Sequence, residues 1–182
     1  MEETLVDYTH AVGRVRFQIS PIAADRMFRI AHEMAGTGRL CLEDMRGLRA
    51  LTLPLSETFT RVIAVEDNAE AVRMLQGHGL EIRTLGYEAV HAKAETTLVA
   101  MLGELRPDAV VLDPPRKGVG PEISQALGAS QTPRVVLLSC DPQALATDLR
   151  ALIEPVFHLR QVVPIDQFPR SAHVESVVLL ER

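Results

Sequence analysis

The sequence predicts an α/β fold in which helices flank a mostly parallel β-sheet. Short apolar runs, such as 109–112 and 135–138, recur along the chain, and most are followed by a segment with helical periodicity. This alternation of strands and helices is the pattern of a parallel sheet. The last two predicted strands, 158–163 and 174–180, have no helix between them, so we expect an antiparallel pair at the C-terminal end.

The elements can be placed in order along the chain. An alternating segment at 12–19 leads into a helix over 23–34, which Pro21 can open. Five strands are then predicted, at 40–43, 62–65, 81–84, 109–112 and 135–139. The helices predicted to follow them are 47–55, 69–76, 96–105, 121–127 and 142–153. With the closing strand pair, this order matches the Rossmann-like sheet of class I methyltransferases.

The length of 182 residues allows one full-sized domain. We expect a single domain over 1–182, with a lead-in strand and helix at 1–38 and the Rossmann-like core at 39–182. The apolar runs are far shorter than the roughly 20 residues of a membrane span, and the first residues lack a basic-then-apolar signal. The sequence therefore predicts a soluble, cytoplasmic protein.

The charge balance and the cysteines narrow the function classes. The chain has 24 acidic and 19 basic residues, a net charge of -5, which argues against binding nucleic acid by bulk phosphate attraction. Local basic patches are still compatible with this balance. Cys41 and Cys140 are too few for a disulfide framework and lack the paired spacing of a zinc or iron–sulfur site, so we expect no metal centre.

Acidic residues follow two of the predicted strands, at the edge where open α/β sheets bind ligands. Glu66 comes after 62–65, where a nucleotide-binding sheet places a ribose-binding carboxylate. A helix-cap cluster, in which Asp67 or Asn68 caps the next helix, fits this single motif equally well. Asp113 comes after 109–112 and precedes two prolines, Arg116, Lys117 and a glycine. The prolines hold the chain extended, so Asp113 is presented rigidly. A plain strand-ending turn, the alternative, needs fewer of these residues.

A cysteine and a glutamate stand at two further strand ends. Cys140 follows 135–139 and precedes a helix that Pro142 opens, and a helix N-terminus favours a thiolate. A small buried core residue is the ordinary alternative for a lone cysteine. Glu175 lies at the start of the last predicted strand, and a solvent-facing strand acid is its ordinary alternative.

Three segments in order, DPPRKG at 113–118, LSCDPQALATDL at 138–149 and DQFPRSAHVE at 166–175, closely resemble the RNA (uracil-5-)-methyltransferase family. The resemblance implies S-adenosylmethionine as the methyl donor and a uridine of rRNA or tRNA as the substrate. It also implies that Cys140 attacks C6 of the uracil and that Glu175 removes the C5 proton after methyl transfer. Asp113 would line the pocket for the donor and the base.

The residue types fit this chemistry. C5 of uracil is a poor nucleophile until a thiolate adds at C6 and gives it enolate character. After C5 has received the methyl group, Glu175 would take the C5 proton, and elimination would free Cys140. Arg116 or Lys117 could stabilise the enolate oxygen or hold a phosphate.

The chain departs from the family at the methyl-donor site. Of the glycine pair expected after the first strand, Gly47 is present, but Arg49 occupies the second position and should crowd the donor. Lys93 stands where an acid that pairs with the adenine amine is expected. Glu66 is the donor-site acid that remains, so we expect Glu66, Asp113 and Gly47 to hold the donor weakly.

Two other interpretations stay open. The altered glycine loop and Lys93 favour a catalytically weak or inactive relative that acts as an RNA- or protein-binding module. A small-molecule methyltransferase on the same fold leaves Cys140 and Glu175 together without a reason. The family's N-terminal RNA-binding barrel does not fit before Val12, so we expect a fragment or a short form whose RNA affinity comes from elsewhere, such as a protein partner.

Overall fold

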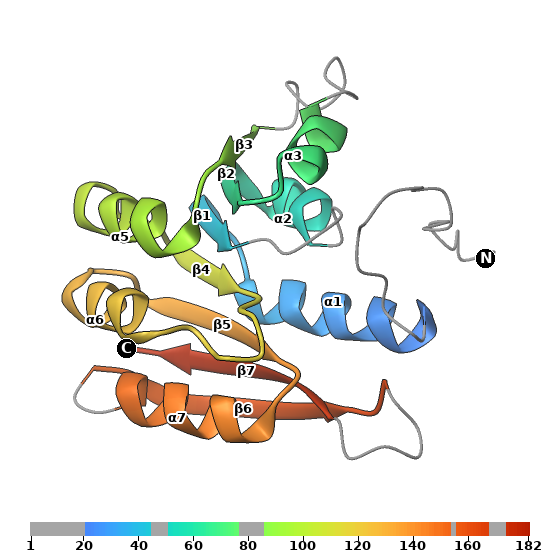
Figure 1. The fold of residues 1–182 in the computed structure, drawn as a ribbon, viewed down its shortest axis with the longest axis vertical. Helices are drawn as coiled ribbons and strands as arrows, with labels where there is room; N and C mark the ends of the chain where they lie inside the picture. Colours follow the sequence, from blue (N-terminus) through green and yellow to red (C-terminus); the bar gives the residue numbers. More distant parts are fainter. Residues whose placement is uncertain (1–20, 45–50, 77–85, 154–155, 168–173) are drawn as a thin grey trace.

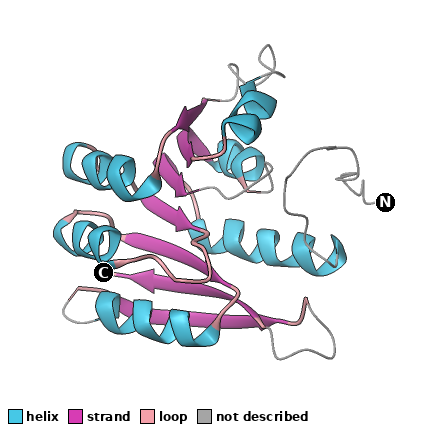
Figure 2. Ribbon diagram, in the orientation of Figure 1, coloured by secondary structure: helices cyan, strands magenta, loops and turns pink. Residues whose placement is uncertain are grey.

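One seven-stranded sheet, with helices on both faces, organises the chain (Figures 1 and 2). The computed structural model describes residues 21–44, 51–76, 86–153, 156–167 and 174–182. The strands lie in the order β3-β2-β1-β4-β5-β7-β6. Their bounds are β1 Gly38–Asp44, β2 Phe59–Glu66, β3 Tyr87–His91, β4 Ala109–Leu112, β5 Arg134–Ser139, β6 His158–Ile165 and β7 Glu175–Glu181.

The first five strands are parallel, and β7 runs antiparallel to both β5 and β6. This confirms the predicted α/β fold with an antiparallel C-terminal pair. The edge strand β6 has an irregular register between Leu159 and Gln161. Because β7 lies between β5 and β6, the chain returns into the sheet after it has reached the edge, and the start of β7 comes beside the end of β5.

Six helices are described, three on each side of the sheet in Figure 1. One group holds α1 Pro21–Ala35, α2 Thr52–Thr58 and α3 Ala69–Gln76, and the other holds α5 Ala94–Glu104, α6 Pro121–Ala129 and α7 Pro142–Ile153. Side chains that accept backbone hydrogen bonds cap the starts of two of these helices. Asn68 accepts the Glu70 N–H at 2.9 Å ahead of α3, and Asp141 accepts the Gln143 N–H at 2.8 Å ahead of α7. None of the described helices is long and apolar enough to cross a bilayer.

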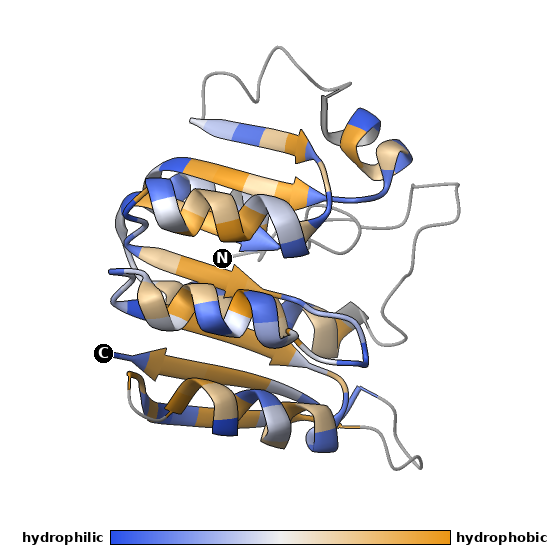
Figure 3. Cartoon of the chain, turned by 60° about the vertical axis from the view of Figure 1, so that its left-hand side comes forward, coloured by the Kyte–Doolittle hydropathy of each residue, from blue (hydrophilic) through white to orange (hydrophobic). Residues whose placement is uncertain are grey.

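Two hydrophobic cores lie on the two faces of the sheet. Alternate residues of β4 serve each of them, with Val110 and Leu112 packing on the α5–α7 side and Val111 on the α1–α2 side. Every residue of β4 is buried, as a central parallel strand requires. Figure 3 shows the strands as mostly hydrophobic and the helices in front of them as mixed. The cores therefore hold the strand ends in fixed positions, which is what a site at one sheet edge needs.

Most predicted elements are confirmed. The structure places α3, β4 and α7 on the same residues as the sequence did, and the helix predicted at 23–34 is α1. The helix predicted at 47–55 begins instead at Thr52 among the described residues. The lead-in segment predicted at 12–19 lies outside the described residues. The predicted cytoplasmic location stays a prediction.

The third strand of the sheet is not where the sequence placed it. The predicted strand at 81–84 lies outside the described residues, whereas the partner of β2 is Tyr87–His91, for which the sequence predicts no element. This edge strand has no apolar run, and its Glu88 is exposed and bonded to Arg61 on β2 at 2.7 Å. Strands of mixed polarity at a sheet edge give a weak periodic signal.

We predict that Gly86→Ala destabilises the protein by at least about 2 kcal/mol, because Gly86 has a φ of +68° and an added Cβ would collide with the Thr60 carbonyl oxygen of β2. The backbone here also carries a ladder bond, from the Val62 N–H to the Gly86 carbonyl at 2.9 Å. Urea unfolding measures the change. Gly103→Ala in α5, where a Cβ meets no atom within 4 Å, is the control and should stabilise by about 0.5–1 kcal/mol. Equal stability of the two variants would contradict the β2–β3 pairing.

Candidate active site

The sheet gathers most of the predicted site residues at one edge. Parallel strands end at the same side of a sheet, so Glu66 at the end of β2, Asp113 after β4 and Cys140 after β5 share this edge. Glu175 joins them because β7 is antiparallel and begins there. Ser139 pairs with Ser176, so the residues next to this pair, Cys140 and Glu175, lie side by side across the strands.

The Cys140 thiol is partly buried and lies among three charged groups. Burial raises its pKa above the ordinary value, the nearby Glu175 carboxylate raises it further, and Asp113 does so to a smaller extent. The Arg116 guanidinium opposes these effects and lowers the pKa. The net result is a raised pKa, so the predicted stabilisation of the thiolate at the helix N-terminus is outweighed by burial and by Glu175, and Arg116 reduces this penalty on the form that attacks an electrophilic carbon.

Glu175 is the second chemical group of the site and is only 7% exposed. Burial raises the pKa of its carboxyl, and Arg116 again lowers it. A carboxylate with a raised pKa is a stronger base than an exposed one, which suits proton abstraction from carbon. One guanidinium thus favours the charged forms of both the thiol and the carboxyl.

Arg116 and Lys117 are the central residues of a β-turn that runs from Pro115 to Gly118. The Gly118 N–H closes this turn by donating to the Pro115 carbonyl at 2.8 Å. Lys117 is directed to α5, where its Nζ lies 3.5 Å from Glu95 Oε1. Of the two cations that the sequence assigned to the substrate, Arg116 is therefore the one that acts on Cys140, while the substrate role of both stays a prediction.

Three buried carboxylates lie at the ends of β1 and β2: Glu43, Asp44 and Glu66, each at most 5% exposed. Burial raises the pKa of Glu43 to about 7, and the charges of Asp44 and Glu66 raise it too, against the lowering effect of the Thr52 hydroxyl, which donates to Glu43 at 2.6 Å. In the described part of the chain, no group of three His, Cys, Asp or Glu side chains could hold a metal ion. Glu43, Asp44 and Glu66 thus form an acidic cluster at this edge of the sheet.

Neither Glu43 nor Asp44 is among the site residues that the sequence predicts, although both end a buried strand, which is the signal that identifies Glu66. The Asn68 side chain caps α3, as the alternative for this motif predicts, and Glu66 accepts the Asn68 N–H at 2.8 Å. Its role in donor binding stays a prediction.

Two residues that bear on the donor, Gly47 and Arg49, lie outside the described residues. Lys93 is exposed at the start of α5, and the preceding Ala92 N–H donates to the Glu66 carbonyl at 3.0 Å. The structure thus places Lys93 near the acidic cluster, beside the end of β3.

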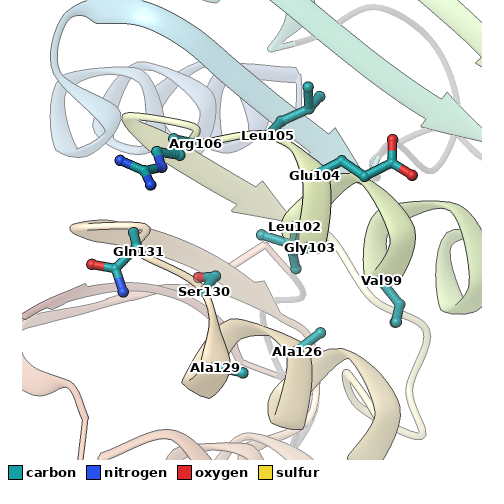
Figure 4. Close-up of a pocket in the computed structure, with 10 residues that line it drawn as sticks. All are labelled: Val99, Leu102, Gly103, Glu104, Leu105, Arg106, Ala126, Ala129, Ser130 and Gln131. Atoms are coloured by element: carbon teal, nitrogen blue, oxygen red, sulfur yellow. The ribbon is translucent and has the colours of Figure 1, made fainter.

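A surface hollow of about 480 Å³ lies between α5 and α6 (Figure 4). Its lining includes Arg106, just before β4, and Gln131, just before β5. These are the amino ends of the strands, so the hollow lies at the edge of the sheet opposite Cys140 and is separate from the site.

Comparisons with known proteins identify the family of the chain. Residues 88–182 match the family model described as tRNA (Uracil-5-)-methyltransferase, a range that holds Asp113, Cys140 and Glu175. An uncharacterized RNA methyltransferase of Clostridium acetobutylicum is 30% identical over 100% of this chain, and one of Gloeobacter violaceus is 38% identical over 75% of it. The chain spans 41% and 29% of the lengths of these two relatives.

A solved structure shares the fold. The tRNA (uracil-54, C5)-methyltransferase of Pyrococcus abyssi, in complex with S-adenosyl-L-homocysteine, superposes with a TM-score of 0.75 at 24% identity. The match covers 92% of this chain and 40% of that one. The fold is therefore the Rossmann-like methyltransferase fold, and because the family model matches more than half of the sequence, the chain belongs to the RNA (uracil-5-)-methyltransferase family.

Proposed function

We propose that this chain is the catalytic part of an S-adenosylmethionine-dependent methyltransferase that acts on C5 of a uridine in rRNA or tRNA through a covalent Cys140 intermediate. The observation that carries the proposal is the grouping of Cys140, Glu175 and Arg116 at the junction of β5 and β7. This reaction needs a nucleophilic thiol and a carboxylate base, and here one guanidinium favours the charged forms of both. The family membership supports the same reaction.

The acidic cluster fits the methyl donor. S-adenosylmethionine carries a sulfonium and an ammonium group, and Glu43, Asp44 and Glu66 present buried negative charge at the ends of β1 and β2. A bound cation would relieve the repulsion that contributes to the raised pKa of Glu43. Glu66 would bind the ribose hydroxyls, and Asp113 would lie between the donor and the base. The donor, when bound, supplies the methyl group from its sulfonium.

The chain's own residues would perform the remaining steps. Arg116 favours the Cys140 thiolate, whose sulfur forms a bond to C6 of the uracil while the electron pair of the C5–C6 bond moves toward O4. Arg116 is also placed to stabilise the resulting enolate. Once C5 carries the methyl group, Glu175 takes the C5 proton, the C5–C6 double bond forms again, and the carbon–sulfur bond breaks to release the thiolate.

A non-catalytic role as an RNA- or protein-binding module is the second candidate. The observation that favours it is Lys93, an exposed lysine that follows Ala92, whose N–H donates to the Glu66 carbonyl, because a positive charge near the acidic cluster would repel a cationic donor. A titration with S-adenosylmethionine separates the two candidates, because the second requires no donor affinity.

RNA that contains 5-fluorouridine should become covalently attached to the protein when S-adenosylmethionine is present. Fluorine at C5 cannot leave as a proton, so the adduct cannot resolve. Denaturing gel electrophoresis and mass spectrometry detect the adduct. Cys140→Ala should abolish it, whereas Cys41→Ala, which changes a cysteine buried in the core, should retain it. An adduct that persists in Cys140→Ala would exclude Cys140 as the nucleophile.

Glu175→Gln should accumulate a methylated covalent complex with unmodified RNA. Addition and methyl transfer do not need a base at C5, but release does. Intact-mass measurement after a single turnover shows the complex, and Glu122→Gln, which removes an exposed carboxylate on α6, is the matched control that should turn over normally. Normal product release by Glu175→Gln would remove Glu175 from the mechanism.

Affinity for S-adenosylmethionine should rise several-fold between pH 6 and pH 8. Glu43, with its pKa raised to about 7, is mostly protonated at the lower pH and adds its negative charge to the cluster at the higher one. Isothermal titration calorimetry measures the affinity. Glu43→Gln should flatten the pH dependence, and S-adenosylhomocysteine, which lacks the sulfonium charge, should show a smaller rise. An equal rise for wild type and Glu43→Gln would exclude this assignment, and no binding at any pH would favour the non-catalytic role.

A further inference from the structure

A buried carboxylate on α7 is bonded to the end of the turn that carries Arg116. Asp148 is 6% exposed, and both of its carboxylate oxygens accept the Val119 N–H, each at 3.1 Å. The backbone of Gly120 donates to it as well. Burial raises the pKa of Asp148, and these two backbone bonds lower it, so they favour its charged form.

The contact between Asp148 and the turn leaves no spare room. Gly118, the last residue of the turn, has a φ of +87°, and a Cβ added there would lie 2.7 Å from each Asp148 oxygen. The glycine thus allows the turn backbone to approach the carboxylate and to adopt a left-handed conformation. Asp148 thereby fixes the position where the turn ends.

This contact joins helix α7, which follows Cys140, to the turn that carries Arg116. Helix α7 begins two residues after Cys140, and the turn carries Arg116 at its corner. Lys117 has an ion-pair partner, Glu95, whereas Arg116 forms no ion pair within the part of the chain that the structure describes. The backbone of the turn sets where the Arg116 side chain begins.

We propose that Asp148 is a positioning residue, which holds the Val119 and Gly120 N–H groups so that the turn directs Arg116 at Cys140 and Glu175. This inference rests on the proposed function for its consequence in catalysis, since Arg116 favours the thiolate. Loss of the carboxylate would leave two backbone N–H groups without their acceptor in a buried place, so the turn would shift to reach other partners. Arg116 would then move away from the thiol.

The test is the pH dependence of Cys140 alkylation by iodoacetamide in Asp148→Asn. The asparagine side chain has the same shape but directs an NH₂ group at one of the two donors. Trypsin separates Cys140, in peptide 135–150, from Cys41, in peptide 40–46, so mass spectrometry follows each thiol alone. The midpoint is the pH at which the alkylation rate is half its maximum. We expect the midpoint for Cys140 to rise and its alkylation rate at pH 7 to fall about threefold or more.

The direction in which the Cys140 midpoint moves distinguishes a positioning role of Asp148 from a direct effect of its charge on the thiol. The charged groups that face Cys140 are Glu175 from β7 and Arg116 and Asp113 from the segment after β4. Removal of a negative charge at Asp148 would, by itself, lower the pKa of a nearby thiol. A higher midpoint therefore requires a displaced Arg116, and an unchanged or lower midpoint would overturn the proposal.

A double variant tests whether Asp148 acts through Arg116. Arg116→Gln alone should raise the midpoint, and Asp148→Asn should add nothing in that background. An additive shift would overturn the proposal. Ser130→Ala is the matched control, since it removes a buried side chain that donates to the Leu127 carbonyl at 2.9 Å at the far end of α6, and it should leave the midpoint unchanged.

Gly118→Ala probes the same contact with Asp148 intact and decides the question if Asp148→Asn does not fold. It should raise the Cys140 midpoint, whereas Gly103→Ala should not, and no shift in folded Gly118→Ala would overturn the proposal. Alkylation needs neither RNA nor donor. A failure of the 5-fluorouridine experiment would therefore count against the proposed function alone, and an unchanged midpoint against the positioning role alone.

Discussion

The pairing of β7 with β5 is the constraint on which the site depends. The parallel strands β1, β2, β4 and β5 bring their carboxyl ends to one edge, but a parallel sheet alone would deliver only residues that follow strands. Because β7 enters the sheet antiparallel, with Ser176 opposite Ser139, it delivers the first residue of a strand to that same edge. Glu175 is thus held by the strand pairing beside Cys140.

The edge divides into two electrostatic regions. At β1 and β2 the buried side chains are carboxylates, with Thr52 as a hydroxyl donor to one of them. At β4, β5 and β7 the charges are mixed, and one guanidinium faces both a thiol and a carboxyl. A cationic ligand is favoured on the first side and an anionic transition state on the second. The order of strands in the sheet therefore separates the acidic cluster from the group of Cys140, Glu175 and Arg116, which is the separation that the proposed function requires.

The sequence predicted the elements that local chemistry defines. Proline and capping residues marked α7, and a continuous apolar run marked β4. It could not place β3, an edge strand of mixed polarity, because its position depends on pairing with β2. For the site, strand ends identified Glu66, Asp113 and Cys140, but only the family resemblance joined Glu175 to Cys140. Their proximity comes from strand register, and the contact of Asp148 with the turn comes from packing, neither of which periodicity reports.

The irregular register of β6 has a consequence for how copies of the protein behave at high concentration. An edge strand exposes backbone groups that another chain can extend, and Leu159 and Val162 are each 43% exposed here. Three features oppose such extension: the bulge at Leu159 and Gln161, the charged Arg160 paired with Glu181 at 3.2 Å, and Pro164, which has no N–H to offer. These features disfavour the addition of a further strand from another chain to this edge.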